Sequence, residues 1–277
     1  MNEQILMEKL RELRLPGFIE GIIEQRTSSR YQELPFEERL AFLVDRECLR
    51  RSSQKLDRRI KNARLRHSAT IDSVDFRVER GLSKNKFLEL GTCRWVTERV
   101  SLIITGPTGA GKSFLASALA DQACKLGSTA LYTRTSDLIA ELLLAKTDGS
   151  FKNLRKRLSK VDLLILDDWL RDPLEAQHAR EILDLIDDRF RRASCLFSSQ
   201  LPMTDWHRTI PDPTIADAIL DRIVHDAIRI ELTGESMRKR TSPLPNRGKT
   251  SLRSVKSIKN SLRERKQKNL TPSQITK

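Results

Sequence analysis

The chain has 277 residues, of which 38% are hydrophobic and 32% are charged, and its formal net charge at pH 7 is +14. This length allows one large domain or two modest ones, and the absence of any run of about 18 apolar residues excludes a transmembrane helix. The first residues lack the basic and apolar regions of a signal peptide, so we expect a cytoplasmic protein. The excess of positive charge indicates a polyanionic partner.

Residues 1–66 are predicted to form a small all-α domain that serves DNA contact or oligomerisation. Apolar side chains recur at helical spacing on either side of Pro16-Gly17 and again after Pro35, which suits the first turn of a helix. The second half of this last helix is basic. We call five of its side chains the basic stripe and expect them to face DNA: Arg51, Lys55, Arg58, Arg59 and Arg66. A solvated charged face is the alternative interpretation.

Residues 67–98 are predicted to be a connector with a short helix near 84–90. From residue 99 strands and helices alternate, which is typical of a three-layer α/β domain with a parallel sheet, and we assign this domain to residues 99–240. The candidate strands are 99–104, 130–133, 162–166, 194–198 and 228–232. The candidate helices are 113–125, 137–145 with Ser136 as its N-cap, 151–159, 175–191 and 214–225.

The end of the chain, residues 241–277, differs from the rest in composition. It carries ten Lys or Arg side chains against Glu264 as its one acidic residue, and it has few large apolar side chains. Such a segment cannot bury enough apolar surface to fold alone, so we expect a flexible, disordered basic tail.

Residues 106–113 read G-P-T-G-A-G-K-S and satisfy the phosphate-loop pattern G-x-x-x-x-G-K-[ST] in full. Glycines let consecutive N–H groups point at a polyphosphate, and the following helix adds the positive end of its dipole. We expect Lys112 to contact the β- and γ-phosphates of ATP and Ser113 to bind Mg²⁺. The residues expected to bind the nucleotide are Gly106, Pro107, Thr108, Gly109, Ala110, Gly111, Lys112, Ser113 and Phe114.

Two further apolar strands end in polar groups, where the carboxyl ends of parallel strands line a ligand crevice. The strand at 162–166 is followed by Asp167 and Asp168, which we assign to Mg²⁺ binding and to polarising the attacking water. Ser199 or Gln200, after the next strand, is predicted to hold the γ-phosphate or the water. Ordinary strand ends remain the alternative.

Two arginines near the end of the α/β domain are further candidates. Arg222 lies late on an amphipathic helix, where it can act as a finger on a neighbouring subunit's nucleotide or form an intrahelical ion pair. Arg238 lies in a helix predicted to start at Gly234, within reach of a phosphate.

In combination, these motifs closely resemble the IstB-type transposition helper ATPases, which are AAA+ proteins related to DnaC-type helicase loaders and to DnaA. The resemblance covers about residues 5–240 and rests on residues 106–113, 163–168, 198–202, 213–222 and 234–238, with 10–17 and 36–40 near the start. It implies an AAA+ phosphate-loop domain at 99–240. It also implies that Asp167 is the Mg²⁺ carboxylate, Asp168 the catalytic carboxylate, Ser199 and Gln200 sensor 1, Arg222 the trans-acting finger and Arg238 sensor 2.

The resemblance further implies that the protein binds and slowly hydrolyses ATP with Mg²⁺. It would assemble as a ring or spiral homo-oligomer on double-stranded DNA and deliver that DNA to an IstA-type transposase. One departure is Asp168, where many AAA+ proteins have Glu, and another is the sequence Asp168-Trp169-Leu170. Three alternatives stay open: a DnaC-like replicative helicase loader, a small-molecule kinase, and a nucleotide-gated clamp that does not hydrolyse ATP.

Overall fold

The computed structural model describes residues 3–234, 236 and 237. The chain begins with three helices, α1 (Glu3–Glu12), α2 (Pro16–Thr27) and α3 (Phe36–Ala63). Helices α2 and α3 approach closely at two glycines of α2. The N–H of Gly17 donates to Glu47 Oε2 at 2.7 Å, and a Cβ at Gly21 would lie 2.5 Å from Leu43 Cδ2. This close crossing requires glycine on α2, because a larger residue would push the two helices apart.

A parallel sheet of five strands follows, in the order β2-β3-β4-β1-β5. The strands are β1 (Leu102–Thr105), β2 (Ala130–Arg134), β3 (Leu163–Asp167), β4 (Ser194–Ser199) and β5 (Ile228–Glu231). The register pairs Thr105 with Ser199 and Arg134 with Asp167. The carboxyl ends of β1, β3 and β4 therefore lie next to one another at one edge of the sheet, which is where ligands bind in open α/β sheets.

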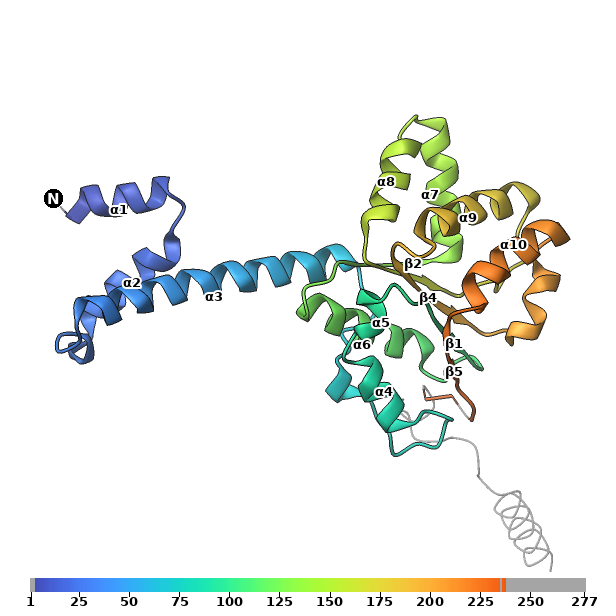
Figure 1. Ribbon diagram of the computed structural model, residues 1–277, viewed down its shortest axis with the longest axis horizontal. Helices are drawn as coiled ribbons and strands as arrows, with labels where there is room; N and C mark the ends of the chain where they lie inside the picture. The colour runs from blue at the N-terminus through green and yellow to red at the C-terminus, as the bar shows by residue number, and fades with distance from the viewer. Residues whose placement is uncertain (1–2, 235, 238–277) are drawn as a thin grey trace, which may run out of the picture. The chain divides into compact units, whose positions relative to one another are not determined.

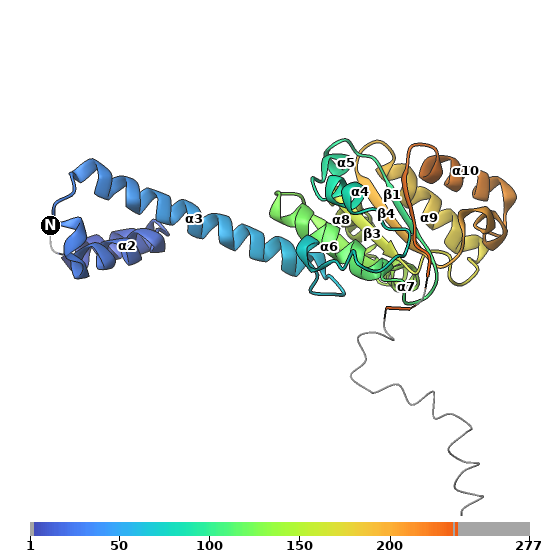
Figure 2. The same ribbon diagram turned by 90° about the horizontal axis from the view of Figure 1, so that it is seen from below.

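Helices cover both faces of this sheet (Figures 1 and 2). On one face lie α4 (Lys84–Leu90), α5 (Arg94–Thr97) and α6 (Lys112–Lys125), and on the other α7 (Thr135–Thr147), α8 (Phe151–Lys160), α9 (Ala176–Arg189) and α10 (Pro213–Val224). In β1, Leu102 and Ile104 point into the first layer and Ile103 into the second. Strands covered on both faces are apolar throughout, which explains the continuous hydrophobic runs in the sequence.

Short 3₁₀ turns complete the described chain, at Ser29–Tyr31, Ile71–Ser73, Met203–Asp205 and His207–Thr209. The five strands and the helices of the α/β domain lie within a few residues of their predicted bounds. The prediction that Ser136 caps a helix is wrong. Helix α7 begins at Thr135, so Ser136 lies inside its first turn, where its Oγ contacts Asp137 Oδ1 at 3.4 Å.

None of the described helices is long and apolar enough to cross a membrane. The predicted basic tail, residues 241–277, lies outside the described residues.

Arg189, at the end of α9, is buried at the amino edge of the sheet, with 1% of its surface exposed. Its guanidinium donates to the carbonyl oxygens of Leu158, Val161 and Ser194, and its Nε to Cys195 Sγ. These acceptors belong to α8, the following loop and β4, so one side chain joins three segments of the second layer.

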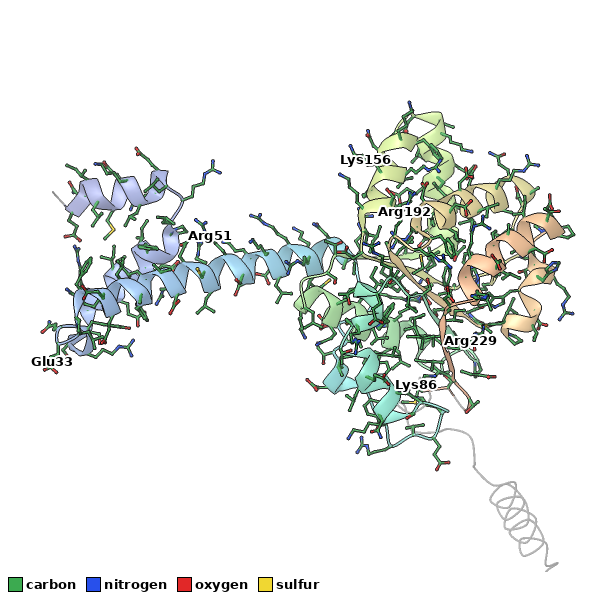
Figure 3. All side chains as sticks on the ribbon, in the orientation of Figure 1. Glu33, Arg51, Lys86, Lys156, Arg192 and Arg229 are labelled. Carbon is green, nitrogen blue, oxygen red and sulfur yellow. The ribbon has the colours of Figure 1, made fainter. Side chains whose placement is uncertain are left out.

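We expect Arg189→Met to lower the free energy of unfolding by about 3 kcal/mol, because a buried carbonyl left without a donor costs about 1–3 kcal/mol. Urea unfolding followed by circular dichroism measures this loss. The matched control is Arg192→Met, since Arg192 is exposed nearby (Figure 3). Equal unfolding midpoints for the two variants would contradict the structural role of Arg189.

Candidate nucleotide-binding site

The phosphate loop connects β1 to α6 and depends on three glycines. Gly106, Gly109 and Gly111 all have positive φ, at 144°, 83° and 98°. All three also lie against other chain segments. A Cβ at Gly106 would come within 2.5 Å of the Leu232 carbonyl oxygen, one at Gly109 would collide with Ser236, and one at Gly111 would lie 2.7 Å from Arg80 Nη1. The spacing of glycines in the sequence therefore reflects both backbone conformation and close packing.

Lys112 begins α6 and folds back over the loop. Its Nζ donates to the carbonyl oxygens of Gly106 at 2.7 Å and Pro107 at 3.0 Å, and only 7% of its surface is exposed. The ammonium is thus held at the loop itself, where the positive end of α6 also points. This places two sources of positive charge where the sequence predicted phosphates.

Asp167, at the end of β3, is fully buried beside the start of α6. Its Oδ2 accepts hydrogen bonds from Ser113 Oγ at 2.7 Å and from Tyr132 OH, and it lies 3.3 Å from Arg66 Nη1. Burial alone would raise the pKa of Asp167, but the hydroxyls of Ser198, Tyr132 and Ser113 outweigh it and hold the pKa below its ordinary value. The carboxylate is therefore charged at neutral pH.

The other oxygen of this carboxylate, Oδ1, is buried and has no hydrogen-bond donor among the described residues. Ser198 lies close enough to favour the charged carboxylate, yet its Oγ is not in hydrogen-bonding geometry with Oδ1 and is itself unsatisfied. A buried carboxylate with an unsatisfied oxygen beside a serine hydroxyl is the hard oxygen donor set that Mg²⁺ prefers. The residues present therefore fit a magnesium ion bound together with phosphates.

Asp168 follows in the left-handed region, with φ at 53°. Its carboxylate lies 3.9 Å from Arg134 Nε and 3.6 Å from Arg171 Nη1, and it borders a cavity of about 200 Å³ with Thr135 and His178. The two consecutive aspartates thus have different surroundings. Asp167 lies under the phosphate loop, whereas Asp168 meets solvent beside two arginines.

The two candidates at the end of β4 also differ. Ser199 is fully buried, and its Oγ donates to the Trp169 carbonyl oxygen at 2.7 Å. Gln200 instead accepts a hydrogen bond from Thr108 Oγ1 of the phosphate loop at 2.6 Å. Gln200 therefore contacts the phosphate loop, whereas Ser199 links β4 to the turn after β3.

Arg222 lies at the amino ends of the strands, whereas the phosphate loop lies at their carboxyl ends. It borders a cavity of about 590 Å³ together with Arg99 and Ser101, which precede β1, whereas the loop follows β1. Its Nε pairs with Asp187 of α9, and its Nη1 donates to the Ala218 carbonyl oxygen at 2.7 Å. Arg222 therefore lies far from the phosphate loop of the same chain.

Arg238 lies outside the described residues. The helix predicted from Gly234 is not present in the described part of that segment, since Ser236 is not helical and Met237 lies in a turn. Ser236 nevertheless lies against Gly109 of the loop.

The basic stripe divides into two groups. Lys55 and Arg58 are exposed on α3, as is Arg51 (Figure 3), which pairs with Glu47 at 2.7 Å. Arg59 donates to the Cys124 carbonyl oxygen of α6 at 3.4 Å, and Arg66 lies at Asp167. Arg66 thus lies beside Asp167 and not on α3 with the other four, because the helix ends at Ala63 and the chain then turns towards β3.

Two further residues of this site were not predicted from the sequence. Arg80 of the connector is 4% exposed and lies under the phosphate loop, where its Nη1 donates to the Ala110 carbonyl oxygen at 3.1 Å. Tyr132 of β2 donates to Asp167, and burial together with this contact raises its pKa, so that it keeps its proton. Neither residue belongs to a local motif, and the only available signal was the position of Tyr132 in a strand next to β3.

Comparison with known proteins identifies the family. The model of the family described as IstB-like ATP binding protein matches residues 8–244. The chain belongs to this family. A protein of Sinorhizobium fredii assigned as an ATP-binding protein of an insertion sequence is 42% identical over 233 residues, covering 84% of this chain and 95% of the relative. A protein of Pseudomonas fluorescens assigned in the same way to insertion sequence IS1162 is 41% identical over 203 residues, covering 73% and 88%.

Solved structures show that this member of the IstB-like family shares its fold with DnaI and DnaA. DnaI superposes with a TM-score of 0.53 at 23% identity, covering 60% of this chain and 92% of DnaI. AMPPCP-bound DnaA from Aquifex aeolicus superposes with a TM-score of 0.50 at 20% identity, covering 76% of this chain and 59% of DnaA. The predicted α/β fold and the resemblance to the IstB family are thereby confirmed.

Proposed function

We propose that this protein is an ATP-dependent DNA-binding AAA+ ATPase that assembles on duplex target DNA and delivers it to an IstA-type transposase. The observation that carries the proposal is the contact of Ser113 and Asp167 at 2.7 Å, which joins the phosphate loop to the acidic end of β3 in a member of the IstB-like family. Relatives named as ATP-binding proteins of insertion sequences support the link to transposition.

Each residue of the site has a proposed part in ATP hydrolysis. Lys112 and the amides of residues 106–113 hold the phosphates, while Ser113 and Asp167 hold Mg²⁺, which when bound neutralises charge on the phosphates. Asp168 accepts a proton from the attacking water. Gln200, bound to Thr108 of the loop, orients that water or the γ-phosphate. Arg238 is proposed to contact a phosphate as sensor 2.

The position of Arg222 supports assembly into a ring or spiral. Because Arg222 lies at the amino edge of the sheet and the nucleotide at the carboxyl edge, it would serve the nucleotide of a neighbouring subunit. Contacts between different faces of identical subunits are head-to-tail, and they generate rings or helical assemblies. In a single chain, Arg222 is held by Asp187, and subunit contact would release it.

The DNA-binding surface is proposed to be the row formed by Arg51, Lys55 and Arg58 on α3. These residues are spaced at i, i+4 and i+7, so they follow one side of the helix, and all three are exposed. A row of cations attracts the phosphate backbone without reading the base sequence, so little sequence preference is expected.

The double variant Lys55→Gln, Arg58→Gln is expected to weaken binding to duplex DNA and to reduce the dependence of log K on log salt concentration by about 1.8, or about 0.9 per lost phosphate contact. Fluorescence anisotropy at several salt concentrations, with a non-hydrolysable ATP analogue, measures both. The matched control is Lys152→Gln, Lys156→Gln on α8, which removes two exposed charges elsewhere. Lys156 is labelled in Figure 3. Equal slopes for the two double variants would exclude this face of α3.

The helicase-loader alternative shares the ATPase core but prefers single-stranded DNA. The same anisotropy assay with single- and double-stranded oligonucleotides separates the two functions. Preference for single strands would favour the loader, and preference for duplex DNA would favour the transposition helper. The likeness to DnaI concerns the fold alone and does not favour either function.

A further inference from the structure

The segment that ends the DNA-binding helix also reaches the nucleotide site. Helix α3 ends at Ala63, and Arg64 adopts a left-handed conformation with φ at 51°, which turns the chain. Two residues later, Arg66 Nη1 lies 3.3 Å from Asp167 Oδ2. One short turn therefore connects the helix that carries the proposed DNA-binding row with the carboxylate that is proposed to bind Mg²⁺.

This turn is anchored to the ATPase domain. Ala63 is fully buried in the core layer that contains α6, and Ile60 and Leu65 pack against the same layer. The ring of His67 lies 6.1 Å from that of Phe114, which follows Ser113 directly. A change in the position of Arg66 would therefore displace the end of α3, because the residues on either side of Arg66 are closely packed.

The hydrogen-bond donors around Asp167 are unequally divided between its two carboxylate oxygens, which favours the replacement of one of these donors. Three donors, from Ser113, Tyr132 and Arg66, converge on Oδ2, while Oδ1 has no donor among the described residues. One carboxylate oxygen offers about two lone-pair sites, so the third donor is the most easily replaced. Tyr132 is buried and Ser113 is held by its backbone in α6, whereas the Arg66 side chain is 30% exposed and long enough to move.

We propose that Arg66 is a nucleotide-responsive residue that leaves Asp167 when Mg²⁺ and a triphosphate bind, and thereby transmits the nucleotide state to α3. A divalent cation at Asp167 repels the guanidinium by like charge, and the γ-phosphate offers it an anionic partner that the diphosphate lacks. Arg66 therefore binds the carboxylate in the absence of a triphosphate and the γ-phosphate in its presence. This inference deepens the proposed function and rests on it for the DNA-binding role of α3.

The proposal makes ATP binding and DNA binding energetically coupled through one side chain. Coupling is reciprocal, so the ratio of DNA affinities with and without triphosphate equals the ratio of triphosphate affinities with and without DNA. Removing the guanidinium should reduce this ratio.

The variant Arg66→Gln is expected to reduce the stimulation of duplex binding by a non-hydrolysable ATP analogue, relative to ADP, at least about fivefold, which corresponds to the lower end of typical coupling. Arg66→Lys should lie between wild type and Arg66→Gln, because a lysine supplies the charge without the planar fork. The matched control is Arg64→Gln, which removes an exposed charge two residues away. Unchanged stimulation in Arg66→Gln would overturn the proposal.

Amide hydrogen exchange of residues 60–70 gives a second readout that does not depend on DNA. In the wild type, the Mg²⁺ complex of the analogue should change the exchange rate of this segment and ADP should not, and Arg66→Gln should abolish the difference. If the wild type shows this difference but binds no DNA, the proposed function fails and the role of Arg66 stands. If it binds DNA but the segment responds equally to both nucleotides, the role of Arg66 fails and the proposed function stands.

Discussion

Lys112→Ala is expected to weaken the binding of Mg²⁺–ATP by about 100-fold, because a charge-assisted hydrogen bond contributes about 1.5–3 kcal/mol and every 1.4 kcal/mol is tenfold in affinity. The ammonium is buried within the loop, where its attraction for phosphates is little screened by solvent. The variant also loses the two hydrogen bonds that Lys112 donates to the carbonyl oxygens of Gly106 and Pro107, so the loop itself becomes less ordered.

Isothermal titration calorimetry with a non-hydrolysable analogue measures this loss. Lys125→Ala is the matched control, because Lys125 lies in the last turn of the same helix, far from the loop, and pairs with Asp121 at 2.7 Å. Thermal unfolding of both variants tests whether the fold is retained. Retained affinity in a folded Lys112→Ala protein would remove the basis for assigning residues 106–113 to nucleotide binding.

The fold and part of the site could be predicted because their signals are local. Buried parallel strands are apolar along their whole length, so the alternation of strands and helices is visible without any contact information. Asp167 and Gln200 could be proposed because each follows such a strand, and the carboxyl ends of neighbouring parallel strands meet at one edge. The distinction between Ser199 and Gln200 could not be predicted, since adjacent residues at a strand end point to opposite sides.

Residues that reach the site from distant segments could not be found in this way. Arg66 contacts a residue 101 positions away, and in the sequence it is indistinguishable from Arg58, because both lie in the same basic segment. The two arginines differ because the helix ends between them, and the left-handed turn at Arg64 redirects the chain. Arg80 lies under the phosphate loop, and the N–H of Thr233 donates to its carbonyl oxygen at 2.9 Å. No periodicity in the sequence predicts this contact between distant segments.

Arg222→Ala is expected to leave ATP binding unchanged and to reduce oligomer-dependent hydrolysis by about 10³-fold, the lower end of the effect of a trans-acting arginine in phosphoryl transfer. The structure explains why binding should be spared, since Arg222 lies at the edge of the sheet opposite the phosphate loop. Phosphate release in the presence of duplex DNA measures the rate, and calorimetry measures the affinity. Arg229→Ala is the control, because Arg229 is an exposed arginine that follows the same helix (Figure 3).

A mixing experiment tests whether Arg222 acts across subunits. Asp168→Ala removes the proposed proton acceptor, so this variant and Arg222→Ala should each be inactive alone. Equal background rates of phosphate release in wild type and Asp168→Ala would instead support a clamp that does not hydrolyse ATP. When the two variants are mixed equally, a site with intact Asp168 meets a neighbour with intact Arg222 at about a quarter of head-to-tail interfaces. About a quarter of the wild-type rate should therefore return. No recovery in mixed oligomers would mean that Arg222 acts within its own chain, through its ion pair with Asp187.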